Sequence, residues 1–431
     1  MDYQNYRKKI MDIGGLYIHV PFCLSKCPYC DFYSQTNLDL IPSYLSALKK
    51  EMALTSSFAA IQGVRGVSER KNPAISTDDN RIPPEGIGVL RSEISRTPNG
   101  KPLPSFDTIY LGGGTPSLLK PAEIAEIIEA AYRFFTVSRK AEISLEANPG
   151  TISAEYLKEI KTVGINRINI GIQSFKDKTL KFLGRIHSAQ ESHDAISNAR
   201  GAGFKNMGLD LIYGLASQSK KDWIDQLQTA TSYSPEHLSC YMLTFEPGTL
   251  FDTWKKSGKI RGARDATLRS LFETTIEVLE KSGHIYYETS NFAKSRQYQS
   301  RHNKKYWSHT PYLGLGPSAH SFQEPVRYWN HRSLERYIHD LNKGIRPVAG
   351  QENLDDDALL LERVYLGLRT AQGISIKTLN KRFGIDFCRK FASVLSALGN
   401  EGNISLTPER CILTPKGRVF CDGIAARLMT S

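Results

Sequence analysis

Short apolar runs rich in β-branched residues alternate with stretches of helical periodicity along the first two thirds of the chain. The runs predicted as strands are Leu16–Val20, Thr108–Leu111, Ile143–Ala147, Arg167–Ile172, Met207–Ile212 and His237–Leu243. The helical stretches between them include Pro121–Phe135, Ala154–Val163, Ala189–Ala202 and Lys220–Ser232. Such alternation is typical of a parallel sheet covered by helices. Six units predict an α/β fold, a partial (β/α)6 TIM-like barrel, with the chemistry at the carboxyl ends of its strands.

The rest of the chain divides into three further parts. Residues 57–105 hold six prolines and five glycines without any periodicity, which predicts a flexible insertion between the barrel segments 1–56 and 106–290. Residues 291–350 form a connecting segment. Residues 351–431 combine helical stretches at Asp355–Thr370 and Asp386–Leu398, a strand pair at Ile404–Thr407 and Cys411–Thr414, and a last helix from Pro415. This order predicts a small winged-helix-like α+β domain.

Charge and cysteine usage restrict the partners and the compartment. The net charge of +12 could suit nucleic acid, an anionic membrane surface or a carboxylate-rich substrate, but the basic residues are dispersed, and we expect no nucleic-acid partner. Cys240, Cys388, Cys411 and Cys421 are too scattered for a disulfide framework, which favours a reducing compartment. No signal-peptide pattern or long apolar run is present, so we expect a cytoplasmic protein.

Three cysteines crowd into one short loop, where Cys23, Cys27 and Cys30 have the spacing C-x3-C-x2-C. A structural zinc site takes four ligands, and a four-iron cubane usually takes four cysteines. Three thiolates on such a cluster would leave one iron open to a substrate or cofactor. Two alternatives stay open: unconnected core thiols, and a Cys3His zinc site with His19 as the fourth ligand.

Polar residues stand where the predicted strands end. Gly112, Gly113, Gly114, Thr115 and Pro116 follow one strand, and consecutive glycines let backbone approach a ligand and present N–H groups to it. The next strands end near Glu146, Gln173, Arg185 and Asp210. A carboxylate can accept from a ribose diol, and the planar fork of arginine suits a carboxylate. Together these residues predict a polar ligand at the barrel mouth, although each alone could be a core ion pair.

A second cluster lies at residues 301–307, with the sequence RHNKKYW. Five of the ten histidines, His302, His309, His320, His331 and His339, fall within 38 residues, and Trp307 and Trp329 lie in the same region. Imidazole is a common haem-iron ligand and flat aromatic walls suit a planar macrocycle. His302 is therefore a candidate haem ligand, with a polar surface or core role as the alternative.

Together these motifs resemble the radical S-adenosylmethionine (SAM) superfamily and, within it, the coproporphyrinogen-dehydrogenase-like branch, closest to the HemW family of haem chaperones. The resemblance covers residues 14–430 apart from the insertion. It implies that Cys23, Cys27 and Cys30 ligate a 4Fe-4S cluster whose fourth iron is chelated by SAM. It further implies SAM contacts from matching residues, which are Tyr17, Tyr29, Gly113, Gly114, Thr115, Glu146, Gln173, Arg185 and Asp210.

Two features separate the members of this branch. The dehydrogenases carry a further cysteine two residues after the third, where this chain has Phe32. The motif HNxxYW, formed here by His302, Asn303, Tyr306 and Trp307, resembles the signature of the haem-binding members. The resemblance thus implies haem as cargo, membrane-associated respiratory haemoproteins as recipients, a place in the cytoplasm or at the inner face of the membrane, and no coproporphyrinogen dehydrogenase activity. A homodimer is compatible with the sequence.

Three hypotheses follow. The first is a haem chaperone on a radical SAM scaffold. The second is an oxygen-independent coproporphyrinogen III dehydrogenase, against which Phe32 argues. The third is a zinc protein with an interaction role.

Overall fold

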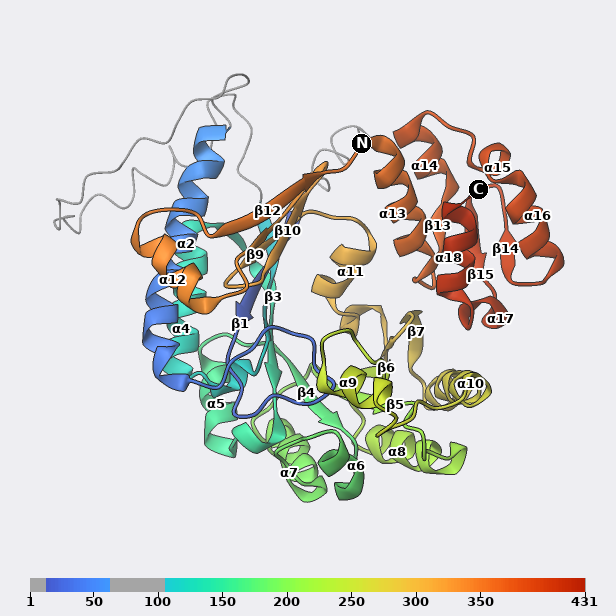
Figure 1. The fold of residues 1–431 in the computed structure, drawn as a ribbon. Coiled ribbons are helices and arrows are strands. Elements are labelled where there is room, and N and C mark those ends of the chain that lie inside the picture. The colour runs from blue at the N-terminus through green and yellow to red at the C-terminus, as the bar shows by residue number, and fades with distance from the viewer. Residues whose placement is uncertain (1–12, 63–104, 431) are drawn as a thin grey trace.

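The computed structural model describes residues 13–62 and 105–430 (Figure 1). Within these residues, six consecutive strands form the parallel centre of one sheet, and their pairing runs in chain order from the first to the sixth. They are β1 (Ile13–Val20), β2 (Ser105–Gly113), β3 (Thr136–Ala147), β4 (Arg167–Gln173), β5 (Met207–Tyr213) and β6 (His237–Met242). The predicted α/β fold with a parallel partial barrel is confirmed.

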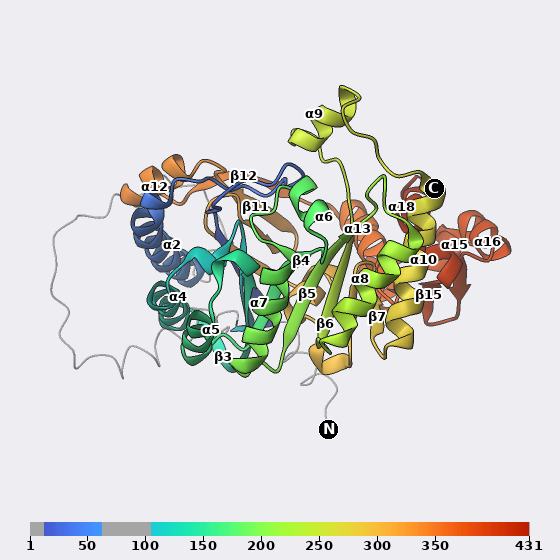
Figure 2. The same cartoon turned by 90° about the horizontal axis from the view of Figure 1, so that it is seen from below.

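Helices cover the outer face of this sheet, as Figure 2 shows. They are α2 (Ile41–Gln62), α4 (Pro121–Phe134), α5 (Ala154–Thr162), α6 (Asp177–Phe182), α7 (Ala189–Gly201), α8 (Lys220–Ser232) and α10 (Asp265–Lys281). Helix α9 (Leu250–Lys256) stands away from that face, beside the cysteine loop. Short 3-10 helices lie at Leu38–Leu40, Pro116–Leu118, Pro149–Thr151 and Arg296–Tyr298. The sequence of α4 explains why such helices pack on the sheet. Its apolar residues repeat at helical spacing and are buried against the sheet, and they are Ile124, Ile127, Ile128 and Ala131.

The predicted insertion at 57–105 lies almost wholly outside the described residues. Helix α2 continues to Gln62 and strand β2 begins at Ser105, so the structure describes only the two flanks of that segment.

The sheet is extended beyond the six predicted strands at both edges. On one side β9 (Tyr312–Leu315) pairs in parallel with β1, and β10 (His320–Gln323), β11 (Val326–Asn330) and β12 (Val348–Asn353) follow in antiparallel order. On the other side β8 (Asn291–Ala293) and β7 (Ile285–Glu288) pair antiparallel with β6 and with each other. The segment 291–350 therefore adds strands to the main sheet, together with α11 (Arg301–Trp307) and α12 (Leu334–Asn342).

A small C-terminal domain follows, with an apolar core separate from that of the barrel. Its helices are α13 (Asp356–Leu368), α14 (Ile376–Phe383), α15 (Phe387–Lys390), α16 (Ala392–Asn400), α17 (Pro415–Arg418) and α18 (Cys421–Met429). Its strands β13 (Ile374–Ser375), β14 (Ile404–Leu406) and β15 (Arg410–Leu413) form a small antiparallel sheet. The predicted strand pair is β14 and β15, whereas β13 and α14 were not predicted. None of the helices in the described residues is long and apolar enough to cross a membrane.

Candidate functional site

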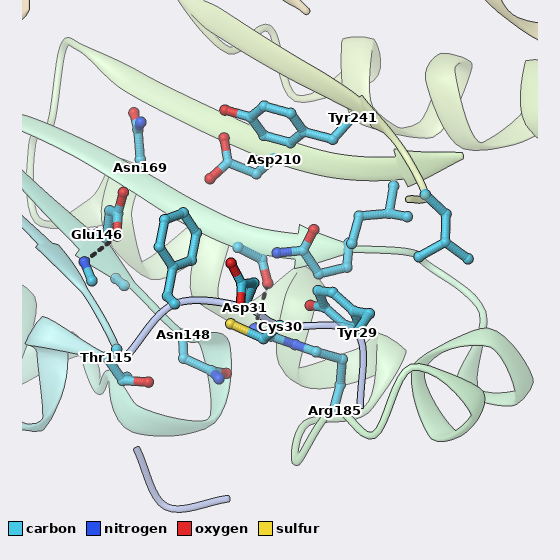
Figure 3. Close-up of a pocket in the computed structure, with 18 of the residues that line it drawn as sticks. Tyr29, Cys30, Asp31, Thr115, Glu146, Asn148, Asn169, Arg185, Asp210 and Tyr241 are labelled. Atoms are coloured by element: carbon cyan, nitrogen blue, oxygen red, sulfur yellow. Dashed lines mark hydrogen bonds between the residues drawn. The ribbon is translucent and has the colours of Figure 1, made fainter. Parts of the chain in front are cut away.

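A pocket of about 540 Å³ opens at the carboxyl ends of the parallel strands (Figure 3). Its lining includes nearly all of the residues predicted there, which are Tyr29, Cys30, Gly113, Gly114, Thr115, Glu146, Gln173, Arg185 and Asp210. Asn148, Asn169 and Tyr241 also line it and were not predicted. Asn169 stands directly opposite Glu146 in the β3–β4 ladder and shares a strand face with Gln173, so the alternation along β4 was the signal that could have found it.

Several polar atoms at this pocket lack protein partners. Asn169 Oδ1, Gln173 Oε1, Arg185 Nε and Asp210 Oδ1 are buried and have no hydrogen-bond partner among the described residues. Buried polar atoms are normally paired, because each unpaired one costs free energy. Four such atoms around one cavity fit a polar ligand with both donors and acceptors.

Two buried carboxyl groups carry raised pKa values. Burial raises the pKa of Glu146 to about 7, and the charge of Asp210 adds to this, while hydrogen bonds from the Tyr110 hydroxyl (2.7 Å) and the Gly113 N–H (3.1 Å) act in the opposite direction. Burial likewise raises the pKa of Asp210 to about 6. Both groups are therefore poised to gain or lose a proton near neutral pH, depending on what binds beside them.

The cysteine loop runs from the end of β1 to this pocket. Cys23 Sγ accepts from Thr115 Oγ1 at 3.4 Å, Cys27 Sγ lies 3.8 Å from Arg185 Nη1, and Cys30 lines the cavity. Burial raises the pKa of Cys30 to about 11, so its ionisation calls for a positive charge such as a metal centre beside it. The loop thus brings three soft donors to the pocket, which fits an iron–sulfur cluster.

His19 is not placed to complete a zinc site with these cysteines. Its Nδ1 is 3.0 Å from the Tyr17 hydroxyl and its Nε2 is 2.8 Å from the Tyr33 carbonyl oxygen, so both ring nitrogens have partners. Across the described residues no three His, Cys, Asp or Glu side chains converge on a single metal ion. A cubane differs in this respect, since each cysteine binds a different iron.

The glycine turn after β2 packs against the cysteine loop rather than presenting free N–H groups. Gly113 N–H donates to Glu146, Gly114 N–H to the Val20 carbonyl (2.8 Å) and Thr115 N–H to the Phe22 carbonyl (2.7 Å). The expectation that these N–H groups are free for a ligand is therefore wrong, although Gly113, Gly114 and Thr115 line the pocket and stay predicted SAM contacts. The turn instead fixes the strand that leads into Cys23.

Gly114 allows this close approach, and its replacement tests it. A Cβ at this position would lie 2.6 Å from the Phe22 carbonyl oxygen and 2.9 Å from its nitrogen, both backbone atoms. We expect Gly114→Ala to displace the cysteine loop, to destabilise the fold by about 1–3 kcal/mol and to lower the iron bound per chain after reconstitution. Gly150→Ala is the matched control, because its nearest neighbours would lie at 3.5 Å or more. Iron analysis and thermal unfolding of both variants check this, and equal iron binding by Gly114→Ala would contradict it.

Tyr17 lies inside the barrel, below the pocket, and does not line it. Its ring stacks on Tyr110 at 6.2 Å between centroids, and the Tyr110 hydroxyl donates to Glu146. Tyr17 would therefore act on a ligand in the pocket indirectly, through Tyr110 and Glu146.

The motif of residues 302–307 lies at the opposite end of the barrel from the pocket. His302 is buried beneath Tyr110 (5.1 Å between ring centroids), and it contacts the early part of β2 through its Nδ1, 2.8 Å from Thr108 Oγ1. Its Nε2 is 2.9 Å from the Tyr306 hydroxyl. The general expectation that the motifs gather at the strands' carboxyl ends is wrong here, because α11 packs at the amino ends of β1 and β2.

The other motif residues belong to the same helix, α11. Asn303 N–H donates to the Ser300 hydroxyl that caps α11, and the buried Nε1 of Trp307 has no partner among the described residues. Tyr306 reaches a second cavity on the far side of the helix.

Comparisons with known proteins agree with this architecture. The profile of the radical SAM superfamily matches residues 98–230, and that of the HemN C-terminal domain matches residues 354–420. Proteins named heme chaperone HemW are similar over nearly their full length. That of Mycobacterium tuberculosis is 31% identical over 96% of this chain and 94% of its own, and that of Bacillus subtilis is 30% identical over 94% and 96%.

A solved structure extends the likeness to the fold. Coproporphyrinogen III oxidase (HemN) from Escherichia coli, described as a radical SAM enzyme, superposes with a TM-score of 0.75 at 20% identity and covers 100% of this chain and 94% of its own. From the cysteine loop, the polar pocket and these similarities together, the chain belongs to the HemW family of the radical SAM superfamily.

Proposed function

We propose that this protein is a haem chaperone that binds a 4Fe-4S cluster and SAM and delivers haem to respiratory haemoproteins. The observation that carries the proposal is the pocket with three thiols at its edge and four unpaired buried polar atoms around it. Relatives about 30% identical over nearly the whole chain are named heme chaperones, which supports haem as the cargo. Phe32, which is 65% exposed, stands where the dehydrogenases carry a further cysteine.

Different residues of the pocket would bind the cluster and the separate chemical groups of SAM. Cys23, Cys27 and Cys30 would hold the cluster, which when bound supplies one-electron chemistry. Arg185 has an unpaired Nε and offers it to a carboxylate such as that of SAM. Glu146 and Asp210 would accept from ribose hydroxyl groups. Tyr29, half-buried beside Arg185, lines the pocket next to Cys30 (Figure 3).

SAM binding should depend on pH through Glu146. Hydroxyl donors favour the ionised carboxylate, whereas the group's pKa in the ligand-free pocket is about 7. Binding therefore releases a proton at lower pH, and we expect affinity to fall as pH drops from 8 to 6, by up to about tenfold per unit below the pKa. Equilibrium dialysis of reconstituted protein with SAM measures this. Because the SAM amine also titrates, the comparison is with Glu146→Gln, whose pH dependence should be flatter. Identical profiles for the two proteins would contradict the assignment.

Delivery at the inner face of the membrane is supported by apolar side chains around the pocket mouth. Leu24 and Phe32 in the cysteine loop are 49% and 65% exposed, and Leu250 at the start of α9 is 55% exposed. Helix α9 lies against that loop, since Phe251 N–H donates to the Pro28 carbonyl at 3.0 Å. Lys255 and Lys256 end the same helix. Exposed apolar groups beside lysines suit an anionic membrane or a membrane-bound acceptor. A homodimer is part of the proposal as an alternative use of this surface.

The test is anaerobic reconstitution followed by parallel titrations with haem and with coproporphyrinogen III, the latter with SAM and a reductant. We expect stoichiometric haem binding and no protoporphyrinogen. Decarboxylated product would favour the dehydrogenase alternative, and a colourless protein with one zinc per chain and no iron would overturn both.

A further inference from the structure

A second cavity of about 530 Å³ lies on the opposite side of α11 from the SAM pocket, between the β9–β11 strands and α13. We call it the β10 groove. Figure 1 shows α11 and α13 beside the strip formed by β9 to β12. Tyr306 of the HNxxYW motif lines the groove, and Tyr365 and Leu366 of α13 form the other wall. Its size is that of a typical small-molecule site.

One face of the added sheet supplies the floor of the groove. His320 stands directly opposite Trp329, and Phe322 stands opposite both Arg327 and Tyr312. Directly opposed residues project on the same side of a sheet, and all five line the groove. The floor therefore presents the rings of His320, Trp329 and Tyr312 with one guanidinium group, while the Phe322 ring is almost wholly buried within it.

The histidines near the groove differ in their availability. His302 has both ring nitrogens hydrogen-bonded, and His309 Nε2 lies 2.9 Å from Glu362. His320 is exposed to the groove, its ring stacks on Trp329 (5.7 Å between centroids, 27° between planes), and no hydrogen bond to its ring nitrogens occurs among the described residues. His309 Nδ1 is also unpaired, but it is buried, so His320 is the groove histidine that is both exposed and free of hydrogen bonds at its two ring nitrogens.

We propose that the β10 groove holds the haem and that His320 is its iron ligand. The inference rests on the proposed function, since it assumes that haem is the cargo. Trp329 and Tyr312 pack against the macrocycle, which buries its apolar rings. The HNxxYW helix then acts as a wall: Tyr306 faces the groove, and its hydroxyl contact with His302 anchors it to the barrel interior. Arg327 is already paired with Glu352 and Glu362, so we expect it to contribute no ion pair to the haem propionates.

The test titrates haem into the wild-type chain, His320→Ala, His302→Ala and His331→Ala, and records affinity and the Soret band. His331 is the matched control, because it belongs to the same region but does not line the groove. We expect His320→Ala to lose at least tenfold in affinity and to change the Soret position, with the wild-type spectrum restored by added imidazole. His331→Ala should match wild type, and His302→Ala should keep the ligand-dependent spectrum.

The outcomes separate the two claims. Absence of haem binding in the wild-type chain would contradict both the proposed function and the inference. If the wild-type chain binds haem and His320→Ala binds it with the same affinity and the same spectrum, the inference alone is contradicted. His320 is exposed, so thermal unfolding of that variant should match wild type and exclude a general loss of structure.

Discussion

Replacing Cys27 with serine should remove the iron–sulfur cluster almost completely. The side chain lies in the loop between Arg185 and the Gly184 carbonyl, at 3.8 and 3.7 Å, where a neutral hydroxyl would replace a soft thiolate ligand. A cubane already held by only three protein ligands has no spare one to lose. Iron and sulfide analysis and the visible absorption of reconstituted protein measure the effect, and we expect iron to fall from about four per chain to below one.

Cys388→Ser is the matched control, because this cysteine is half-buried in the C-terminal domain, far along the chain from the loop. It should reconstitute like wild type. If Cys27→Ser kept a full complement of iron while Cys388→Ser lost it, the cluster would have to be assigned elsewhere.

Glu51→Ala should be among the most destabilising single substitutions in the barrel. The carboxylate is 3% exposed and accepts from Gly316 N–H (2.8 Å), Tyr337 hydroxyl (2.6 Å) and Asn330 Nδ2 (2.5 Å). It thereby joins α2 to the β9–β10 turn, to β11 and to α12. Removing it leaves three buried donors without an acceptor, and we expect a loss of about 3–5 kcal/mol in the free energy of unfolding. Urea unfolding monitored by circular dichroism measures this.

The same carboxyl group gives that prediction a pH signature. Burial raises its pKa from 4.5 to about 7 in the folded chain. The folded state therefore binds more protons than the unfolded state between these values, and stability is lost as pH rises through them. We expect the stability of wild type relative to Glu51→Gln to fall by about 2 kcal/mol between pH 5.5 and 8. A difference that is constant with pH would contradict the raised pKa. Lys50→Ala, an exposed neighbour on α2, should show no such change.

The central strands and their helices were predictable because burial on both faces gives parallel strands continuous apolar runs. Strand β5, Met207–Tyr213, carries a single polar residue, Asp210, and its bounds differ by one residue from the prediction. The added strands could not be predicted in this way. Strand β11, Val326–Asn330, mixes a charged residue, two aromatic residues and a polar one, because one of its faces lines the β10 groove instead of a packed core.

The residues of the candidate site could likewise be predicted from the sequence only in part. Glu146, Gln173 and Asp210 could be placed because a polar residue near the end of an otherwise apolar strand stands out from its neighbours in the sequence. Asn169 could have been found from the alternation along β4, which places it on the strand face of Gln173. Tyr241, 41% exposed near the end of β6, gains its place at the pocket from cross-strand register, which no single segment contains. The position of His302 depends on how α11 docks beneath β2, a tertiary contact between residues almost two hundred positions apart.

The two walls of the β10 groove are held together in different ways. The floor continues from β1, the strand that leads into the cysteine loop, through the backbone ladder of β9. The opposite wall belongs to a domain with its own core, and ion pairs join it to the floor: Glu324 with Arg363 and Arg382, and Glu362 with Arg327. These pairs are partly open to solvent, and charge pairs that solvent reaches weaken as mobile ions screen them. Ionic strength should therefore control how readily this groove opens, and a molecule held there would leave faster in concentrated salt than in dilute buffer.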